Sequence, residues 1–233
     1  MKYLEKPKFS HPSACPYIEG EEYRQEYFLA YDVNEVELDE LFEAGWRRFG
    51  AYFFRPACRF CRKCIPIRTV IPELNLSKSQ RRVMKKNADT RVIVNPLRYD
   101  ERHFEIYKKH SLIKFHNEED EEAFKQSFYL PAAPCGIIEY YRDNILVAFG
   151  FLDFGKESLS SVYFVYDPDY SQYSLGSFSV ITEIKLGQKW GKRHYNLGFW
   201  IKENRSMSYK DRFKPCEIMD WDNYQWNRLD EVK

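Results

Sequence analysis

The sequence predicts an α+β fold, a mixed β-sheet with flanking helices that follows a smaller, cysteine-containing α/β part. Three β-rich runs at residues 136–142, 145–152 and 159–166 are separated only by short turn segments, which is typical of antiparallel strands. Asp143 and Asn144 connect the first two runs, and both residue types tolerate the positive φ of a tight hairpin. A β-meander is therefore expected in the larger part of the sheet.

A strand, a helix and another strand follow one another in the C-terminal half. The helix is expected over residues 174–190, where Val180, Ile181 and Ile184 form an apolar stripe, and the next strand over residues 194–201. Because such a unit returns through a right-handed crossover to a parallel neighbour, the sheet is predicted to be mixed. This order of elements resembles the GNAT acyltransferase fold.

Three further elements are expected before the cysteine-rich loop. Aromatic residues alternate along residues 21–31, which indicates a half-buried strand. A short helix is expected over residues 34–44, with Asn34 as its N-cap and Gly45 at its end. Residues 46–55 are predicted to form a single strand that runs into the loop.

A strongly basic helix is predicted in the middle of the chain. Ser77 and Gln80 have the spacing of a capping box, and few apolar side chains remain to pack the helix on a core. Phosphate binding would explain this composition, and a solvated linker helix is the alternative interpretation. The basic side chains are Lys78, Arg81, Arg82, Lys85 and Lys86.

The same helix is the predicted domain junction. We expect an N-terminal cysteine-containing domain at residues 1–76, the basic junction helix at 77–91 and the GNAT-like domain at 92–233. The last of these begins with a short strand over residues 91–95 and a helix over 99–116.

Composition limits the class of protein. The chain has 233 residues, and its 36 Lys and Arg residues nearly balance 35 Asp and Glu residues. With a net charge of +1, nucleic-acid binding requires basic residues gathered on one face. The N-terminus lacks an apolar stretch of signal-peptide length, and no apolar run is long enough to span a membrane. A cytoplasmic protein with no membrane partner is therefore expected.

Four cysteines form a candidate metal site. Cys58, Cys61 and Cys64 follow one another at three-residue intervals, and Cys15 precedes them beside a proline. In a reducing compartment, clustered thiols indicate metal binding or catalysis before disulfides. These four thiols are expected to hold zinc or an iron–sulfur cluster. Buried free thiols are the alternative interpretation.

Several motifs in a fixed order along nearly the whole chain carry a resemblance to a known family. They are Cys15-Pro-Tyr-Ile-Glu-Gly, the Arg-Pro-x-Cys-x-x-Cys-x-x-Cys-x-Pro-x-Arg run at 55–68, Ser79-Gln-Arg-Arg-Val, Ser160-Ser-Val-Tyr-Phe-Val-Tyr-Asp-Pro-Asp-Tyr, Tyr173-Ser-Leu-Gly and Met207-Ser-Tyr-Lys-Asp-Arg-Phe-Lys-Pro. Together they resemble the aminoacyl-tRNA–protein transferases. Within that family the chain is most similar to the bacterial aspartate/glutamate leucyltransferase branch, itself similar to the eukaryotic arginyl-tRNA–protein transferases.

The resemblance implies an enzyme with aminoacyl-tRNA as co-substrate. The α-amine of a protein that begins with Asp or Glu would attack the aminoacyl ester, and the added residue would mark that protein for N-degron-dependent degradation. Leucine is the expected donor and arginine the alternative. The basic helix would then bind tRNA phosphates. Residues 171–177 contain a single glycine, so the glycine-rich acetyl-CoA turn of acetyltransferases is not evident.

Other functions compete with this one. A non-catalytic RNA-binding module would use the thiol loop and the basic helix as its contact surface. A small-molecule N-acetyltransferase would use the same fold with acetyl-CoA.

Candidate catalytic residues follow from the chemistry of the implied reaction. An aminoacyl ester is already activated, and positioning is worth about 7–11 kcal/mol whereas a general base contributes roughly 10²–10⁴-fold. No catalytic triad is therefore needed. Asp153, Tyr166 and Asp167 lie at predicted strand ends of the cleft and are candidates for orienting the amine or passing a proton.

The acidic side chain of the substrate needs a cationic partner, best a bidentate one. Arg68 directly follows the cysteine loop and is the first candidate, with Lys210 and Arg212 assisting. Cys135 and Cys216 are interpreted as packing residues.

Overall fold

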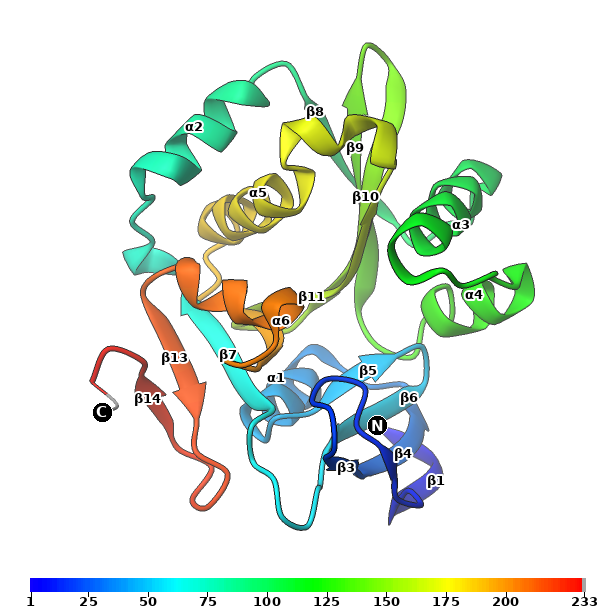
Figure 1. Ribbon diagram of the computed structural model, residues 1–233, viewed down its shortest axis with the longest axis vertical. Helices are drawn as coiled ribbons and strands as arrows, with labels where there is room; N and C mark the ends of the chain where they lie inside the picture. The colour runs from blue at the N-terminus through cyan, green and yellow to red at the C-terminus, as the bar shows by residue number, and fades with distance from the viewer. Residues whose placement is uncertain (232–233) are drawn as a thin grey trace.

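An eight-stranded mixed sheet forms the centre of the protein, whose computed structural model describes residues 1–231 (Figure 1). The strand order is β14-β13-β7-β12-β11-β10-β9-β8. In that order the strands span Trp226–Arg228, Cys216–Met219, Ile65–Val70, His194–Trp200, Ser158–Tyr166, Ile145–Phe154, Cys135–Arg142 and Arg91–Pro96. Strands β9, β10 and β11 form the predicted meander, and Asp143 and Asn144 adopt positive φ in its first turn, as expected.

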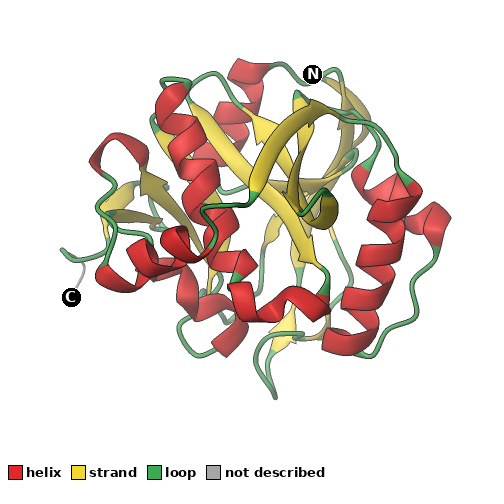
Figure 2. Ribbon diagram, turned by 90° about the horizontal axis from the view of Figure 1, so that it is seen from above, coloured by secondary structure: helices red, strands yellow, loops and turns green. Residues whose placement is uncertain are grey.

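Helices cover both faces of this sheet, as Figures 1 and 2 show. They are α2 (Lys78–Lys86), α3 (Glu101–Phe115), α4 (Glu121–Phe128) and α5 (Leu175–Lys189). On one face, Ile106 of α3 and Phe124 of α4 pack against Phe149 of β10. On the other face, Phe178 of α5 packs against Tyr140 of β9 in a second core cluster. No helix among the described residues is long and apolar enough to cross a membrane.

The N-terminal part builds a second, four-stranded sheet in the order β1-β4-β6-β5. Its strands span Lys2–Phe9, Gln25–Tyr31, Tyr52–Pro56 and Arg47–Phe49, and α1 (Glu35–Glu43) packs on it; β2 (Ser13–Ala14) and β3 (Glu22–Tyr23) form a separate short pair. Asn34 caps α1 as predicted. The single strand predicted over 46–55 is wrong, because Gly50 turns the chain with φ +53° and makes a β5–β6 hairpin.

Strand β7 connects the two parts of the chain. It belongs to the predicted 1–76 unit by sequence, yet it pairs with β12 and β13 inside the large sheet. The N-terminal part therefore contributes a strand to the sheet of the C-terminal part, and the division at residues 77–91 stays a prediction. Short helices complete the chain: η1 (Ile71–Glu73), η2 (Pro168–Tyr173), α6 (Arg205–Ser208) and η3 (Tyr209–Arg212).

Candidate active site

Two neighbouring parallel strands part in the middle of the large sheet. Strands β11 and β12, joined through α5, pair only from Ser158 to Ser160, although β11 continues to Tyr166. A register shift places an extra residue, Val162, in β11 against β10, and a second one places Leu197 in β12 against β7. Such bulges bend strands, so they account for the opening between β11 and β12.

Two adjoining cavities lie along this opening. The larger has a volume of about 620 Å³ and extends from β11 to the N-terminus of α5, and the smaller, of about 310 Å³, reaches the N-terminal sheet. Both are lined by the two bulge residues. The full set of shared residues is Tyr17, Ser161, Val162, Leu197, Met207 and Lys210.

Both cavities are free of acidic side chains. Their lining residues, all within residues 1–231, include no aspartate or glutamate. The smaller cavity is lined by Arg47, Arg48 and Lys210, and the larger by Lys210 and Lys114. The electrostatic field in this cleft therefore favours anionic ligands.

Lys210 lies where the two cavities meet. Its side chain is only 8% exposed, and Nζ donates to the carbonyl oxygen of Phe199 at 2.7 Å and lies 3.6 Å from Met207 Sδ. Burial, reinforced by the nearby charge of Arg47, lowers the pKa of Lys210 to about 7. Of the three predicted substrate-binding residues, Lys210 is the one that lines the cleft.

Arg47 is a site residue that the sequence interpretation missed. Its guanidinium donates to Ser160 Oγ and to the carbonyl oxygens of Ser161 and Asn196. Burial lowers its pKa to about 10, so it stays charged at neutral pH. Two consecutive arginines inside an apolar strand were the available signal, because each needs a partner in the fold.

Asp153, a predicted catalytic residue, lies in a buried ion pair outside both cavities. It is 1% exposed, lines neither cavity, and receives hydrogen bonds on both carboxylate oxygens from Arg48, the Nε bond being 3.0 Å long. This buried ion pair joins β5 to β10.

The other two catalytic candidates differ from each other. Tyr166 lines the larger cavity. Asp167 lines neither, and it is bonded to Lys109 at 2.6 Å and to Arg102 at 3.3 Å. Burial favours its neutral form, but the bonds from Lys109 and the Asp169 backbone outweigh it and lower the pKa of Asp167. It therefore acts as a charged anchor between η2 and α3.

Arg68 already has acidic partners inside the protein. Its Nε donates to Glu217 at 2.8 Å, Nη1 pairs with Glu43, and the guanidinium lies 4.1 Å from the centre of the Trp226 ring. Arg68, the residue predicted to contact the substrate carboxylate first, is thus already paired with carboxylates of the protein itself. Arg212 is exposed outside both cavities, and its carbonyl oxygen accepts from Gln80 of α2.

The basic helix α2 lies beside the larger cavity. The capping box of Ser77 and Gln80 forms as predicted. Lys86 donates to the carbonyl of Gln172 and Asn87 to that of Tyr173, which ties α2 to the turn before α5. All five predicted tRNA-binding side chains of α2 are exposed.

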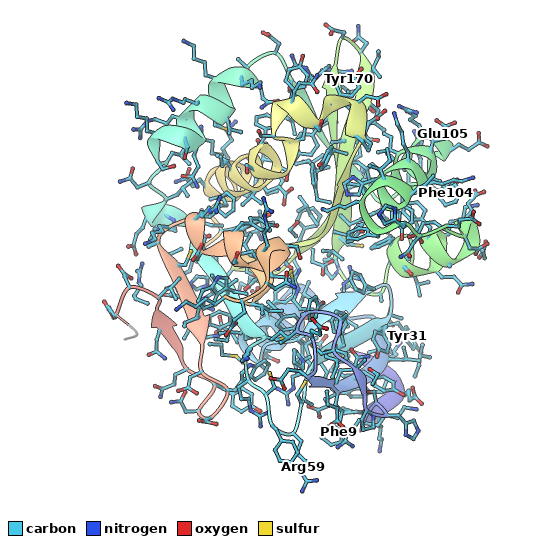
Figure 3. All side chains as sticks on the ribbon, in the orientation of Figure 1. Phe9, Tyr31, Arg59, Phe104, Glu105 and Tyr170 are labelled. Atoms are coloured by element: carbon cyan, nitrogen blue, oxygen red, sulfur yellow. The ribbon has the colours of Figure 1, made fainter. Side chains whose placement is uncertain are left out.

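The four predicted metal-binding thiols share one neighbourhood behind the smaller cavity. Burial raises the pKa of Cys64 to about 12, and Cys58, Cys15 and Cys61 add to that effect. Arg59, at the tip of their loop, points away from the body of the protein (Figure 3). Within residues 1–231, however, no three His, Cys, Asp or Glu side chains are arranged to hold a metal ion. The residue types themselves suit zinc or an iron–sulfur cluster.

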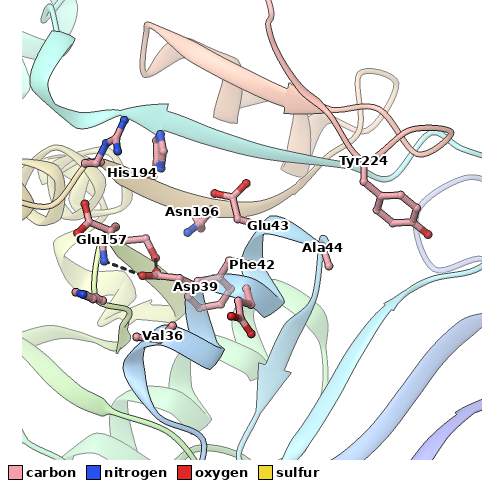
Figure 4. Close-up of a pocket in the computed structure, with 13 residues that line it drawn as sticks. Val36, Asp39, Phe42, Glu43, Ala44, Glu157, His194, Asn196 and Tyr224 are labelled. Atoms are coloured by element: carbon pink, nitrogen blue, oxygen red, sulfur yellow. Dashed lines mark hydrogen bonds between the residues drawn. The ribbon is translucent and has the colours of Figure 1, made fainter.

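A third cavity, of about 650 Å³, lies between α1 and the first residues of β11 and β12 (Figure 4). Asp39 accepts the backbone N–H of Glu157 there at 2.7 Å. Its charged lining is predominantly acidic and consists of Asp39, Glu40, Glu43, Glu157, Lys156 and Arg193. A phosphate or a substrate carboxylate is disfavoured in this cavity.

Comparison with known proteins identifies the family of this chain and agrees with its fold. Residues 13–82 match the family model for the N terminus of arginine-tRNA-protein transferases, and residues 102–220 match that for the C terminus. Of solved structures, FemX aligns with a TM-score of 0.51 at 10% identity, over 76% of this chain and 64% of FemX. The GNAT-like acyltransferase fold expected from the order of elements is thereby confirmed.

Relatives with curated names cover most of the chain. A Campylobacter jejuni protein named aspartate/glutamate leucyltransferase is 35% identical over 88% of this chain and 89% of its own length. A Helicobacter hepaticus protein of the same name is 30% identical over 91% and 90%. The chain therefore belongs to the arginine-tRNA-protein transferase family and is an aminoacyl-tRNA–protein transferase.

Proposed function

We propose that this protein transfers leucine from leucyl-tRNA to the N-terminal α-amine of proteins that begin with Asp or Glu, and so marks them for N-degron-dependent degradation. The observation that carries the proposal is the pair of cavities that meet at Lys210 between β11 and β12. Transfer requires two substrates to meet at one point, and two cavities with a common wall provide such a point.

The larger cavity suits the aminoacyl end of the tRNA. Tyr163 and Phe164 offer aromatic surface for base stacking, and Ser171, Ser174 and Ser177 offer hydroxyl groups near the N-terminus of α5. The exposed cations of α2 lie on this side, where they would bind phosphates of the tRNA without reading its sequence.

The reaction needs little acid–base chemistry from the protein. The neutral α-amine forms a C–N bond with the ester carbonyl carbon, the C–O bond to the ribose breaks, the amine loses a proton and the ribose oxygen gains one. Tyr166, in the larger cavity, is the remaining candidate from the sequence for a contact with these groups. Positioning by the two cavities supplies the main contribution.

The charge of the cleft favours leucine over arginine as donor. A guanidinium would enter a space lined by lysine and arginine side chains with no acidic lining residue in the described chain. A leucyl side chain needs only apolar walls, which Val162, Leu175 and Leu197 supply.

We also propose that Cys15, Cys58, Cys61 and Cys64 bind zinc or an iron–sulfur cluster, and that the protein acts in the cytoplasm. Shared neighbourhood and residue type support the metal proposal. Elemental analysis and absorption spectra of anaerobically purified protein test it, and absence of both zinc and iron would reject it.

Incubation with each labelled aminoacyl-tRNA and with peptides that start with Asp, Glu, Lys or Ala tests the transferase proposal. We expect leucine on the Asp and Glu peptides only. Selective transfer of arginine would overturn the donor, and equal transfer to all four peptides would overturn the acceptor.

A further inference from the structure

Two cations flank one glycine in the smaller cavity. Gly198 has a φ of +84°, and a methyl group built on it would lie 3.4 Å from Arg47 Nε and 3.7 Å from Lys210 Nζ. The missing side chain therefore keeps a small space open between the two positive groups. Because L side chains rarely adopt this backbone conformation, the space is a fixed feature of the strand.

The hydrogen-bond acceptors that the protein supplies to these cations are all neutral, although the charge of Asp153 also acts on Arg47 from a distance. Arg47 donates to one hydroxyl and two carbonyl oxygens through Nη1 and Nη2, and Lys210 donates to one carbonyl oxygen and faces one thioether. The bonds of Arg47 leave its Nε–H unused, and those of Lys210 leave at least one ammonium hydrogen unused. By contrast, the adjacent Arg48 has the carboxylate of Asp153.

We infer that the space between Arg47 and Lys210 at Gly198 binds the side-chain carboxylate of the acceptor's first residue and selects for Asp and Glu. The inference rests on the proposed function and assigns the selectivity to Arg47 in place of Arg68. A carboxylate here accepts a charge-assisted hydrogen bond from each side, whereas an amide or a methyl group gives neither cation a charged hydrogen-bond partner. Asp and Glu differ by one methylene, a difference to which binding sites respond weakly.

The position also fits the reaction. Lys210 lines both cavities, so a carboxylate held there leaves the α-amine, a few bonds away, at the junction with the larger cavity. The charge of Arg47 opposes protonation of Lys210, and a bound anion relieves that repulsion.

Leucyl transfer to peptides starting with Asp and with its neutral isostere Asn tests the inference. For the wild type we expect kcat/KM to be about 100-fold or more higher for the Asp peptide than for the Asn peptide. For Arg47→Met we expect this ratio to be less than about tenfold, chiefly because KM for the Asp peptide rises. Arg193→Met, which removes a cation from the acidic cavity, is the matched control and should keep the wild-type ratio. Affinity for leucyl-tRNA should be the same in all three proteins.

Two further variants keep the test decisive if Arg47→Met does not fold. Lys210→Met removes the opposite cation and should reduce the Asp/Asn ratio in the same way. Retention of the ratio in the folded variants, or its loss in Arg68→Met instead, would overturn the inference while leaving the transferase proposal intact. Failure of the wild type to transfer leucine to any peptide would overturn the proposed function itself.

Discussion

Two cavities of similar volume contact the same two strands and have linings of opposite charge. The cavity at α1 meets the first residues of β11 and β12 and is lined mainly by carboxylates, whereas the cleft at the parted ends of these strands has cations and no lining acid in the described chain. Volume does not separate them, since they measure about 650 and 620 Å³. The charge of the lining distinguishes the two cavities as candidate substrate sites, because tRNA phosphates and an acidic N-terminal residue are both anions.

The same contrast exists between single residues of the cleft. Arg48 is buried and hydrogen-bonded to Asp153, while the half-buried Arg47 and the buried Lys210 donate hydrogen bonds only to neutral groups. The paired cation supports the fold, and the unpaired cations are held at a cost in stability that a ligand offsets. Proteins commonly lose stability at functional sites in this manner.

The largest effect is expected from breaking the paired cation. Asp153→Ala leaves Arg48 buried and uncompensated, which should lower the free energy of unfolding by about 3–5 kcal/mol. Urea unfolding at pH 7 measures it. The control is Asp169→Ala, which removes an exposed carboxylate that pairs with Lys109 and should cost less than about 1 kcal/mol. If Asp153→Ala lowered the free energy of unfolding by less than about 1 kcal/mol, the buried pair would not anchor β5 to β10.

Removing a cation that has no carboxylate partner should instead increase the free energy of unfolding. The pKa of Lys210 falls from 10.5 to about 7, so the folded state binds this proton less tightly than the unfolded chain. The resulting destabilisation is complete below pH 7 and fades as the pH rises to about 10.5. Lys210→Met should therefore raise the free energy of unfolding by about 2–4 kcal/mol at pH 6 and by less than about 1 kcal/mol at pH 10.

Unfolding of both proteins in urea at the two pH values checks this prediction. A variant that is less stable than the wild type at pH 6 would show that Lys210 is compensated inside the protein, and the distinction from Arg48 would fail.

A smaller effect per residue is expected on α2, where exposed cations are screened by salt. The triple variant with Arg81, Arg82 and Lys85 changed to alanine should weaken tRNA binding and lower the slope of log affinity against log salt by up to about three units. A filter-binding series between low and moderate salt measures the slope. Unchanged affinity at every salt concentration would remove α2 from the docking surface.

The smallest effect is expected in the acidic cavity. Glu40 is exposed there, and Glu40→Gln should change the free energy of unfolding by less than about 0.5 kcal/mol and leave leucyl transfer unaltered. A marked loss of transfer activity would place chemistry in the cavity at α1 and reverse the comparison.

Local patterns explain which parts of this structure could be predicted from the sequence. The Asp143-Asn144 hairpin and the capping box of Ser77 and Gln80 depend on neighbours within a few residues, and both form. The β-α-β unit follows from the order of segments that each have their own periodicity, and it forms as well. Strand β1 was missed because its side chains are nearly all exposed, which leaves no apolar alternation.

The site could not be predicted in the same way because its charges are partnered across the fold. Arg68 finds Glu217, which is 149 residues away, and Asp153 finds Arg48, 105 residues away. No local pattern distinguishes an arginine that meets a carboxylate from one that does not. Arg47 and Arg48 are adjacent in sequence, yet Arg48 donates to a carboxylate whereas Arg47 donates to neutral oxygen atoms.

A structure with two ligands bound tests the central claim most directly. The ligands are a 3′-amide analogue of leucyl-adenosine, which cannot be cleaved as the ester is, and a peptide that begins with Asp. The account predicts the leucyl group beside Val162 and Leu197, the adenosine toward the N-terminus of α5, and the Asp carboxylate between Arg47 and Lys210. Binding of either ligand in the acidic cavity at α1, with the cleft between β11 and β12 empty at saturating concentrations, would contradict it.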